Sequence, residues 1–335
     1  MDSIEKLMVF YKYRGFSSRM SEGFRFLTKN MKVILKTSLW VLLPISLIQA
    51  LVYSMYAESV MEFSTMAGKT PDALQAYGAV AVQLLLIWLV AFVGSVLWGA
   101  LVFGMFRKYS MLGYVPAMSI GAWFAWTRRD IWRFFLCLLF VVFFIVILTA
   151  LSIMFMTLSA WTLIVVLPLW IYMGVILAIF PYFYIMESNP LWSAFVMAVR
   201  KGTPSWGAGF GICVLGMILA GIFGVICSLP STITLIIDYF VALGGQDGEV
   251  AQLPAYYGVL KFLFYALSMY GSYLQMLIWG APLLFHYSSL MAHDKEKELA
   301  DALAEQERMK AEQERIQAQK KRESEFLSGS SYKPF

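Results

Sequence analysis

The chain has 335 residues, of which 60% are hydrophobic, 16% aromatic and only 14% charged. A soluble domain usually carries about a quarter charged residues, so this composition and the mean hydropathy of +0.69 exclude an ordinary soluble protein and indicate a lipid environment. The net charge of +5 is typical of Lys and Arg on the cytoplasmic flanks of membrane helices, and no nucleic-acid partner is expected.

The first segment, 1–36, is rich in Lys and Arg and contains no short apolar core. We therefore expect no cleavable signal peptide, and we interpret the segment as a cytoplasmic amphipathic region. The first hydrophobic stretch after it is then expected to remain in the membrane.

Six stretches are long and apolar enough to cross a bilayer as helices, which takes about twenty residues. They are 37–56, 79–106, 134–158, 162–186, 208–230 and 260–291. Ser159, Ala160 and Trp161 mark the expected turn between the third and the fourth. The short apolar stretch 231–243 contains Asp238 and is interpreted as an interfacial or re-entrant helix.

The loops predict the orientation of these spans. Lys and Arg are concentrated in 1–36, 107–133 and 187–206, whereas 57–78 and 244–259 are poor in cations. Because positive charge favours the cytoplasmic side, both termini are predicted to be cytoplasmic and the number of spans to be even. The sequence thus predicts an all-α, polytopic bundle of six transmembrane helices in a cytoplasmic (inner) membrane.

A similar segment precedes the first, third and fifth spans, at 21–35, 119–135 and 191–207. Each has an aromatic residue followed five positions later by a cation, as in Phe24 and Lys29. This pattern is typical of an amphipathic helix at the cytoplasmic surface, with cations facing anionic headgroups. It predicts three repeated units, each a surface helix and a two-span hairpin; the alternative is that inner loops simply collect aromatic and basic residues. The predicted headgroup-binding cations are Arg25, Lys29, Lys32, Arg128, Arg129, Arg200 and Lys201.

The opening string SEGFRFLTKNMKVILKTSLWVLLPISLI and its later degenerate copies carry a family resemblance. Over roughly 16–291 the chain resembles an uncharacterised bacterial multi-pass family, related to the membrane domain attached to some glycerophosphodiester phosphodiesterases. The resemblance implies a helical module of a bacterial cytoplasmic membrane. The catalytic barrel of those enzymes has no counterpart here, so the resemblance does not imply phosphodiesterase activity.

No group of residues combines a nucleophile, a base and an orienting partner, so an enzyme is not expected, and no cofactor is predicted. His286 and His293 have no ligand partner at helical spacing, and Cys137, Cys213 and Cys227 have no CxxC spacing. No metal site is therefore predicted, and these side chains are interpreted as packed or interfacial.

The sixth span carries a polar stripe at spacings of three, four and three. A carrier would use such a stripe to line a cavity, whereas a packed bundle would use it for hydrogen bonds between helices. Small residues on the fifth span predict close helix packing. The stripe and its possible partners on the first two spans are Tyr265, Ser268, Ser272, Gln275, Gln49 and Gln83. The packing residues are Gly216, Ala220 and Gly224.

The segment 292–335 is nearly charge-balanced and is predicted to be a solvated cytoplasmic helix that continues the sixth span, with a disordered end. Its opposite charges at spacings of three and four favour a helix, and a second apolar row for a coiled coil is missing. Residues 292–326 could contact a protein partner. The membrane domain proper is expected over 37–291. We expect a non-catalytic membrane scaffold or envelope-homeostasis factor; the alternative is a carrier or pore for a neutral or amphiphilic solute.

Overall fold

A computed structural model describes residues 3–66, 73–244, 253–254 and 256–329, and every regular element among them is helical. This confirms the predicted all-α class. The α-helices are α1 (Ser3–Phe10), α2 (Phe16–Met66), α3 (Ala73–Leu112), α4 (Ile120–Leu158), α5 (Leu163–Ile185), α6 (Leu191–Gly202), α7 (Trp206–Gly244) and α8 (Tyr257–Gly329). Two short 3-10 helices, η1 (Ala160–Thr162) and η2 (Thr203–Ser205), precede α5 and α7.

Five helical stretches of the described residues are long and apolar enough to cross a membrane. They cover the first five expected spans, which makes the chain a multi-pass membrane protein. The sixth expected span forms the first part of α8, which is not among the five. Its Tyr, Ser and Gln residues lower its hydropathy, and the count of six stays a prediction.

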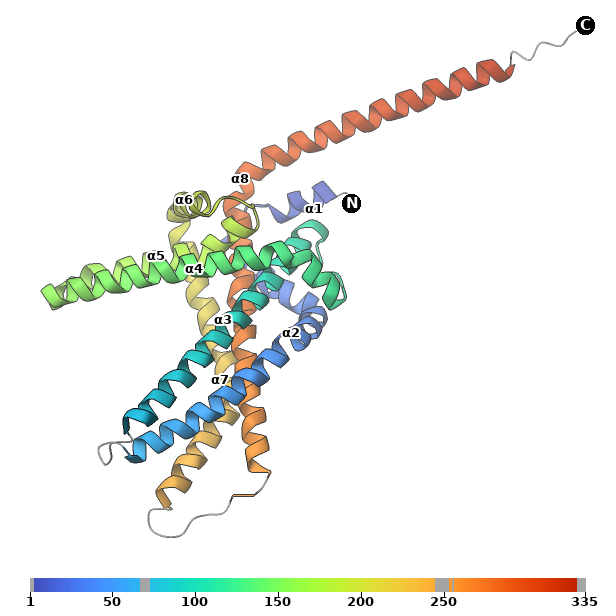
Figure 1. The fold of residues 1–335 in the computed structure, drawn as a ribbon. Coiled ribbons are helices and arrows are strands. Elements are labelled where there is room, and N and C mark those ends of the chain that lie inside the picture. The colour runs from blue at the N-terminus through green and yellow to red at the C-terminus, as the bar shows by residue number, and fades with distance from the viewer. Residues whose placement is uncertain (1–2, 67–72, 245–252, 255, 330–335) are drawn as a thin grey trace, which may run out of the picture.

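α8 is the central helix and packs most extensively against α2 and α7. In Figure 1, α2 and α7 run from the end that carries both termini to the opposite end, and α3 and α8 return. We call these the terminal end and the far end of the bundle. The α4–α5 hairpin projects from the bundle to one side, and its outer parts are apolar and exposed, as at Phe143, Ile153 and Ile164.

The expected turn at Ser159 is confirmed, because α4 ends there and η1 leads into α5. At the start of α4, Ser119 adopts an extended conformation and its hydroxyl accepts a hydrogen bond from the amide of Ala122. Gly113 ends α3 with a φ of +76°, which a glycine adopts without strain.

The prediction that each repeated segment forms a separate surface helix is wrong for the first two copies. Segments 21–35 and 119–135 are not independent surface helices but the first parts of α2 and α4, because no Pro interrupts the chain between each segment and the span that follows it. Only the third copy gives a separate helix, α6. In the first copy, Phe26 and Ile34 pack inward and are almost fully buried, whereas Met31 is exposed.

The stretch 231–243 is not a separate interfacial or re-entrant helix, because α7 continues through it to Gly244. Pro230 removes one backbone donor, and nearby hydroxyls bond to helix carbonyls: Ser231 and Thr232 both donate to the carbonyl of Ser228. The carboxylate of Asp238 is neutralised by Lys261 of α8 at 2.7 Å and accepts a hydrogen bond from Tyr257. An acidic residue is thereby accommodated in an apolar helix.

α8 continues past the expected sixth span to Gly329, as the sequence predicted for the tail. Of the expected disordered end, residues 330–335 lie outside the described part of the chain. We call the part of α8 from Ala292 to Gly329 the tail helix. Its side chains described up to Lys320 are mostly exposed, and Figure 1 shows it leaving the terminal end at an angle to the bundle.

Candidate functional site

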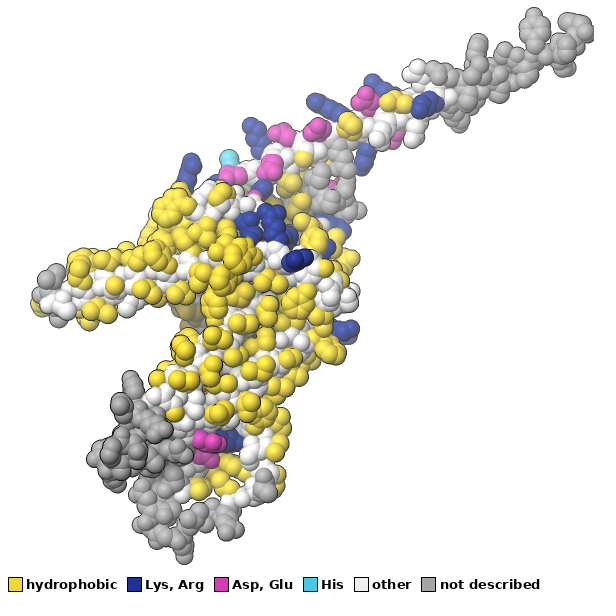
Figure 2. Space-filling model, viewed as in Figure 1, with side chains coloured by type: hydrophobic (Ala, Val, Ile, Leu, Met, Phe, Trp, Pro, Cys, Tyr) yellow, Lys and Arg dark blue, Asp and Glu magenta, His cyan; other side chains and the backbone are white. Residues whose placement is uncertain are grey.

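Lys and Arg side chains gather at the terminal end, around the base of the tail helix, while the face below them is almost wholly hydrophobic (Figure 2). All three predicted cation sets are present on α2, α4 and α6. Arg25, Lys29, Lys32, Arg128, Arg129 and Arg200 are exposed, and Lys201 is half-buried. This charged end is the strongest candidate for a functional surface.

Two of the predicted cations already have protein partners. Arg25 pairs with Glu22 at 3.2 Å on the same helix. Lys201 of α6 pairs with Asp294 of the tail helix at 2.5 Å, and this hydrogen bond is the main reason why the pKa of Asp294 is lowered. The third copy therefore serves partly to hold the base of the tail.

The second copy, on α4, forms an open groove of about 670 Å³, which we call the arginine groove. Its lining residues are Ala125, Trp126, Arg128, Arg129, Trp132, Arg133 and Tyr184. Arg133 forms one wall: its guanidinium donates to the carbonyls of Tyr184 at 2.5 Å and Asn189 at 2.7 Å and lies 4.4 Å from the Tyr184 ring centre. The groove thus combines a wall fixed by hydrogen bonds with two exposed arginines.

Beside the groove, a carboxylate and a guanidinium neutralise each other. Arg107 of α3 donates to Asp130 of α4 at 3.0 Å and to the carbonyl of Ile185 at 2.9 Å. Asp130 is 1% exposed, so this pair ties α3, α4 and the end of α5 together. It also removes the one acid of the segment 107–133 from competition for the other cations.

Glu187, in the connection between α5 and α6, joins the tail to the bundle. Its carboxylate pairs with Lys295 at 3.2 Å and accepts a hydrogen bond from Tyr287, both on α8. The Tyr11 hydroxyl lies 3.5 Å from the same carboxylate. Burial, with Glu187 as a second cause, raises the pKa of Tyr11 to about 12, so this phenol stays protonated at neutral pH.

The connection between α1 and α2 is anchored by two arginines without carboxylate partners among the described residues. Arg14 donates to the carbonyls of Phe10 and Val9, and burial lowers its pKa from the usual range. Arg19 donates to Nδ1 of His286 at 2.7 Å. The ring proton of His286 then belongs on Nε2, which is buried and has no hydrogen-bond partner among the described residues.

Within the described ranges, no three His, Cys, Asp or Glu side chains form a group that could hold a metal ion. The three cysteines are free; Cys137 and Cys213 are buried and Cys227 is half-buried.

The side chains of the predicted polar stripe do not line a common cavity. Tyr265 is buried, Ser272 is exposed and donates to the carbonyl of Met269 on its own helix, and Gln275 lies against Gly224 of α7. Ser268 is half-buried, as is Gln83 on α3. Gln49 is buried but accepts a hydrogen bond at 3.0 Å from Tyr273, which is not a member of the predicted stripe.

The predicted small residues of α7 lie against α8. A Cβ at Gly216 would lie 3.0 Å from the Cβ of Trp279, and one at Gly224 would overlap the amide of Gln275. Ala220, which lies between these two glycines in the sequence, is also buried. Gly271 of α8 approaches Cys227 in the same way, so small residues of both helices allow close approach.

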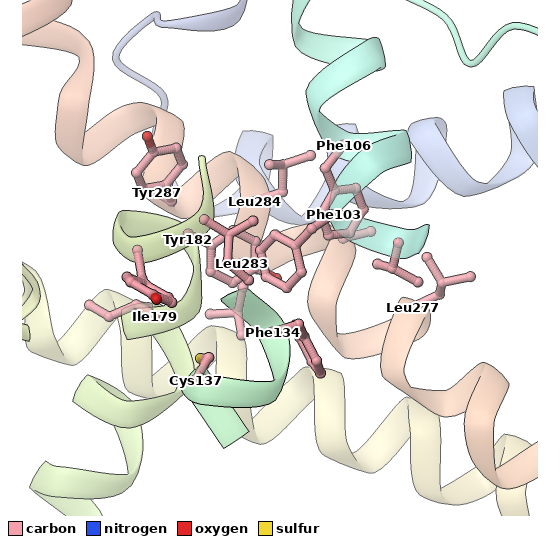
Figure 3. Packing of buried hydrophobic residues seen from close by; sticks show 14 of the residues in the cluster. Phe103, Phe106, Phe134, Cys137, Ile179, Tyr182, Leu277, Leu283, Leu284 and Tyr287 are labelled. Atoms are coloured by element: carbon pink, nitrogen blue, oxygen red, sulfur yellow. The ribbon is translucent and has the colours of Figure 1, made fainter. Parts of the chain in front are cut away.

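An apolar cavity of about 240 Å³ lies where the α4–α5 hairpin joins α3 and α8. Figure 3 shows several of its lining residues, among them Phe103, Phe134, Cys137 and Tyr182, within the main hydrophobic cluster. The Tyr182 hydroxyl is satisfied by the carbonyl of Gly280 at 2.6 Å. We therefore interpret this cavity as part of the hydrophobic packing of the bundle.

Sequence reasoning missed Glu187, Tyr11, Tyr287 and Lys295 as a group. One signal was present: Glu187 is the only acid between Asp130 and Asp238, a stretch otherwise almost wholly apolar. An isolated acid at the end of a span is expected to have a partner, although the sequence spacing does not indicate which residue it is.

Compared with known proteins, the chain matches no protein-family model, no curated protein and no solved structure.

Proposed function

We propose that this protein is a non-catalytic scaffold of a cytoplasmic membrane, which binds anionic lipid at its terminal end and offers its tail helix to a protein partner. In this proposal both termini face the cytoplasm. The observation that supports it best is the group of exposed Lys and Arg side chains at the terminal end, directly beside the first apolar residues of the spans. Such cations attract anionic headgroups by on the order of 1 kcal/mol each.

The held base of the tail supports the second half of the proposal. Lys201–Asp294 and Lys295–Glu187 fix the start of the tail helix to α6 and to the α5–α6 connection. Beyond this base the tail helix is charged and mostly exposed as far as Lys320, and the apolar side chains of Met309 and Ile316 are exposed on it. A long helix held at one end is suited to reach a partner away from the membrane.

Lipid selectivity tests the proposal. The purified protein is reconstituted in phosphatidylcholine, and spin-labelled phosphatidylglycerol and phosphatidylcholine report how strongly each lipid associates. We expect preference for phosphatidylglycerol, and its loss when Lys29, Lys32, Arg128, Arg129, Arg200 and Lys201 are replaced by Gln.

A chain truncated after Glu298 is the control, because it removes the exposed tail and leaves these cations in place. It should keep the lipid preference. Equal association of both lipids with the unaltered protein would refute the lipid half of the proposal.

A further inference from the structure

The cations of the segment 107–133 outnumber its acids by five to one, and the structure shows how each is used. Arg107 is paired with Asp130, and Arg133 is bonded to backbone carbonyls. Lys108 lies over the ring of Trp126, 3.6 Å from its centre. Arg128 and Arg129 remain, exposed and without an ion pair to any carboxylate that the structure describes.

The other two predicted cation sets differ from this one. In the first set Arg25 is paired with Glu22, and in the third Lys201 is paired with Asp294. Lys29 and Arg200 are exposed on helix surfaces and do not line the arginine groove. Lys32 lines a different groove together with Lys36, and the lining of that groove contains no arginine and no tryptophan. Only the second set combines two adjacent free arginines with a concave surface.

Two tryptophans frame the arginine groove. Trp132 is 63% exposed and Trp126 is 37% exposed, and neither can be explained by burial in the protein core. Tryptophan favours the boundary between headgroups and acyl chains. The uncharged run that begins at Phe134 starts one residue after the groove ends, so the groove lies at the edge of the apolar belt.

We propose that the arginine groove is a binding site for the phosphate of an anionic phospholipid, with Arg128 and Arg129 as its ligands and Trp126 and Trp132 beside the glycerol region. The inference rests on the proposed function and narrows it from a cationic surface to one site. A guanidinium donates several hydrogen bonds to phosphate oxygens, and the neutralised Asp130 leaves a positive potential in the groove. Arg133 and Tyr184 position the wall and need not touch the lipid.

Native mass spectrometry of the full chain in detergent tests the site by titration with phosphatidylglycerol, phosphatidylcholine and water-soluble glycerol phosphate. Three double variants are compared with the unaltered protein: Arg128→Gln with Arg129→Gln, Arg128→Lys with Arg129→Lys, and the control Lys297→Gln with Arg308→Gln, which replaces exposed cations of the tail helix. Both Gln variants remove two exposed cations. Circular dichroism and thermal unfolding confirm that all of them are folded.

We expect the groove Gln variant to bind phosphatidylglycerol about thirtyfold more weakly, and the control to bind it as the unaltered protein does. The Lys variant should bind more tightly than the groove Gln variant and less tightly than the unaltered protein, because it keeps the charge and loses the guanidinium hydrogen bonds. Equal weakening in both Gln variants would overturn the site while leaving the general preference for anionic lipid intact. Glycerol phosphate binding as tight as phosphatidylglycerol would overturn the lipid as the ligand, and no preference over phosphatidylcholine in the unaltered protein would refute the proposed function itself.

Discussion

The hydroxyl of Tyr182 on α5 donates a hydrogen bond to the carbonyl of Gly280 on α8, with the two oxygens 2.6 Å apart. Tyr182 is 3% exposed, so water does not compete for this bond. The bond lies two residues before Pro282, which cannot donate to the helix ladder of α8. It fixes the base of the projecting hairpin to the central helix.

Replacing Tyr182 by Phe should lower the free energy of unfolding by about 1 kcal/mol, because a buried hydrogen bond is lost and its acceptor keeps only its helix partner. Thermal unfolding in detergent measures the effect. Tyr172→Phe is the matched control, since its bond to Thr203 is exposed and should matter less. Identical melting of Tyr182→Phe and the unaltered protein would contradict the assignment.

Gly23→Ala should destabilise the bundle by about 1–3 kcal/mol through overpacking. The added Cβ would lie 2.6 Å from the nitrogen and 2.7 Å from the Cα of Pro282, which are backbone atoms and cannot move aside alone. Gly121→Ala is the control, because nothing lies within 4 Å of its Cβ position. Because Gly121 lies in α4, Gly121→Ala should leave the stability unchanged or raise it slightly. A melting temperature that falls equally in both variants would argue against the α2–α8 contact.

The base of the tail should keep its geometry between about pH 5 and about pH 9. The hydrogen bond from Lys201 lowers the pKa of Asp294 below 3.8, so that contribution is complete above 3.8 and lost as the pH falls through the folded value. Burial lowers the pKa of Lys295, but its contacts with Glu298 and Glu187 outweigh it and raise the pKa above 10.5, so that contribution is lost only as the pH rises further.

Pulsed electron resonance between spin labels at Ser193 and Ala304 measures this geometry. One distance distribution is expected throughout the neutral range, and a broader one only when the pH falls through the lowered pKa of Asp294. Asp294→Asn combined with Lys295→Gln should broaden it at neutral pH as well. A distribution that changes within the neutral range would show that another titrating group controls the tail.

Replacing Ser268 and Ser272 by Ala and Gln275 by Leu should lower stability only modestly and leave lipid preference unchanged. Ser272 bonds within its own helix, and Gln275 packs against Gly224. The carrier alternative expects the reverse, with solute uptake by reconstituted vesicles abolished while the bundle stays folded. Uptake of a neutral solute by the unaltered protein, lost in this variant, would make the scaffold proposal untenable.

Labels introduced at positions 68 and 245 should react with an impermeant reagent in intact cells, and a reporter after Phe335 should be cytoplasmic. Both labelled positions lie outside the described residues, but the flanking helix ends of α2, α3 and α7 lie at the far end (Figure 1). Protection of position 68 from external reagent would reverse the proposed orientation.

Hydropathy was sufficient to predict five long apolar helices and the turn at Ser159, because each apolar run must satisfy its own backbone in lipid. The ends of the helices were less predictable. Nothing between Asn30 and Pro44 breaks a helix, so a surface segment and a span became one element, α2. Likewise, the partners that allow Asp238 within α7 come from Tyr257 and Lys261 of another helix.

The site shows the same division. The cations of the terminal end were visible in the sequence because the charge of loops is a local property. Their pairing was not: Arg107 meets Asp130, and Lys201 meets Asp294, only after several helices have packed. The sequence therefore indicated where the basic residues are concentrated, and the structure distinguished Arg128 and Arg129, which have no carboxylate partner among the described residues, from the cations that are paired.

The continuity of α8 makes it a lever. With about 1.5 Å of rise per residue, the tail helix extends on the order of 55 Å beyond the expected sixth span, so a tilt of roughly 10° at its base would move its tip by about 10 Å. The same helix packs against α2 and α7 within the bundle. If the tail helix binds a partner as proposed, a force applied near its tip would act through α8 on its interfaces with α2 and α7.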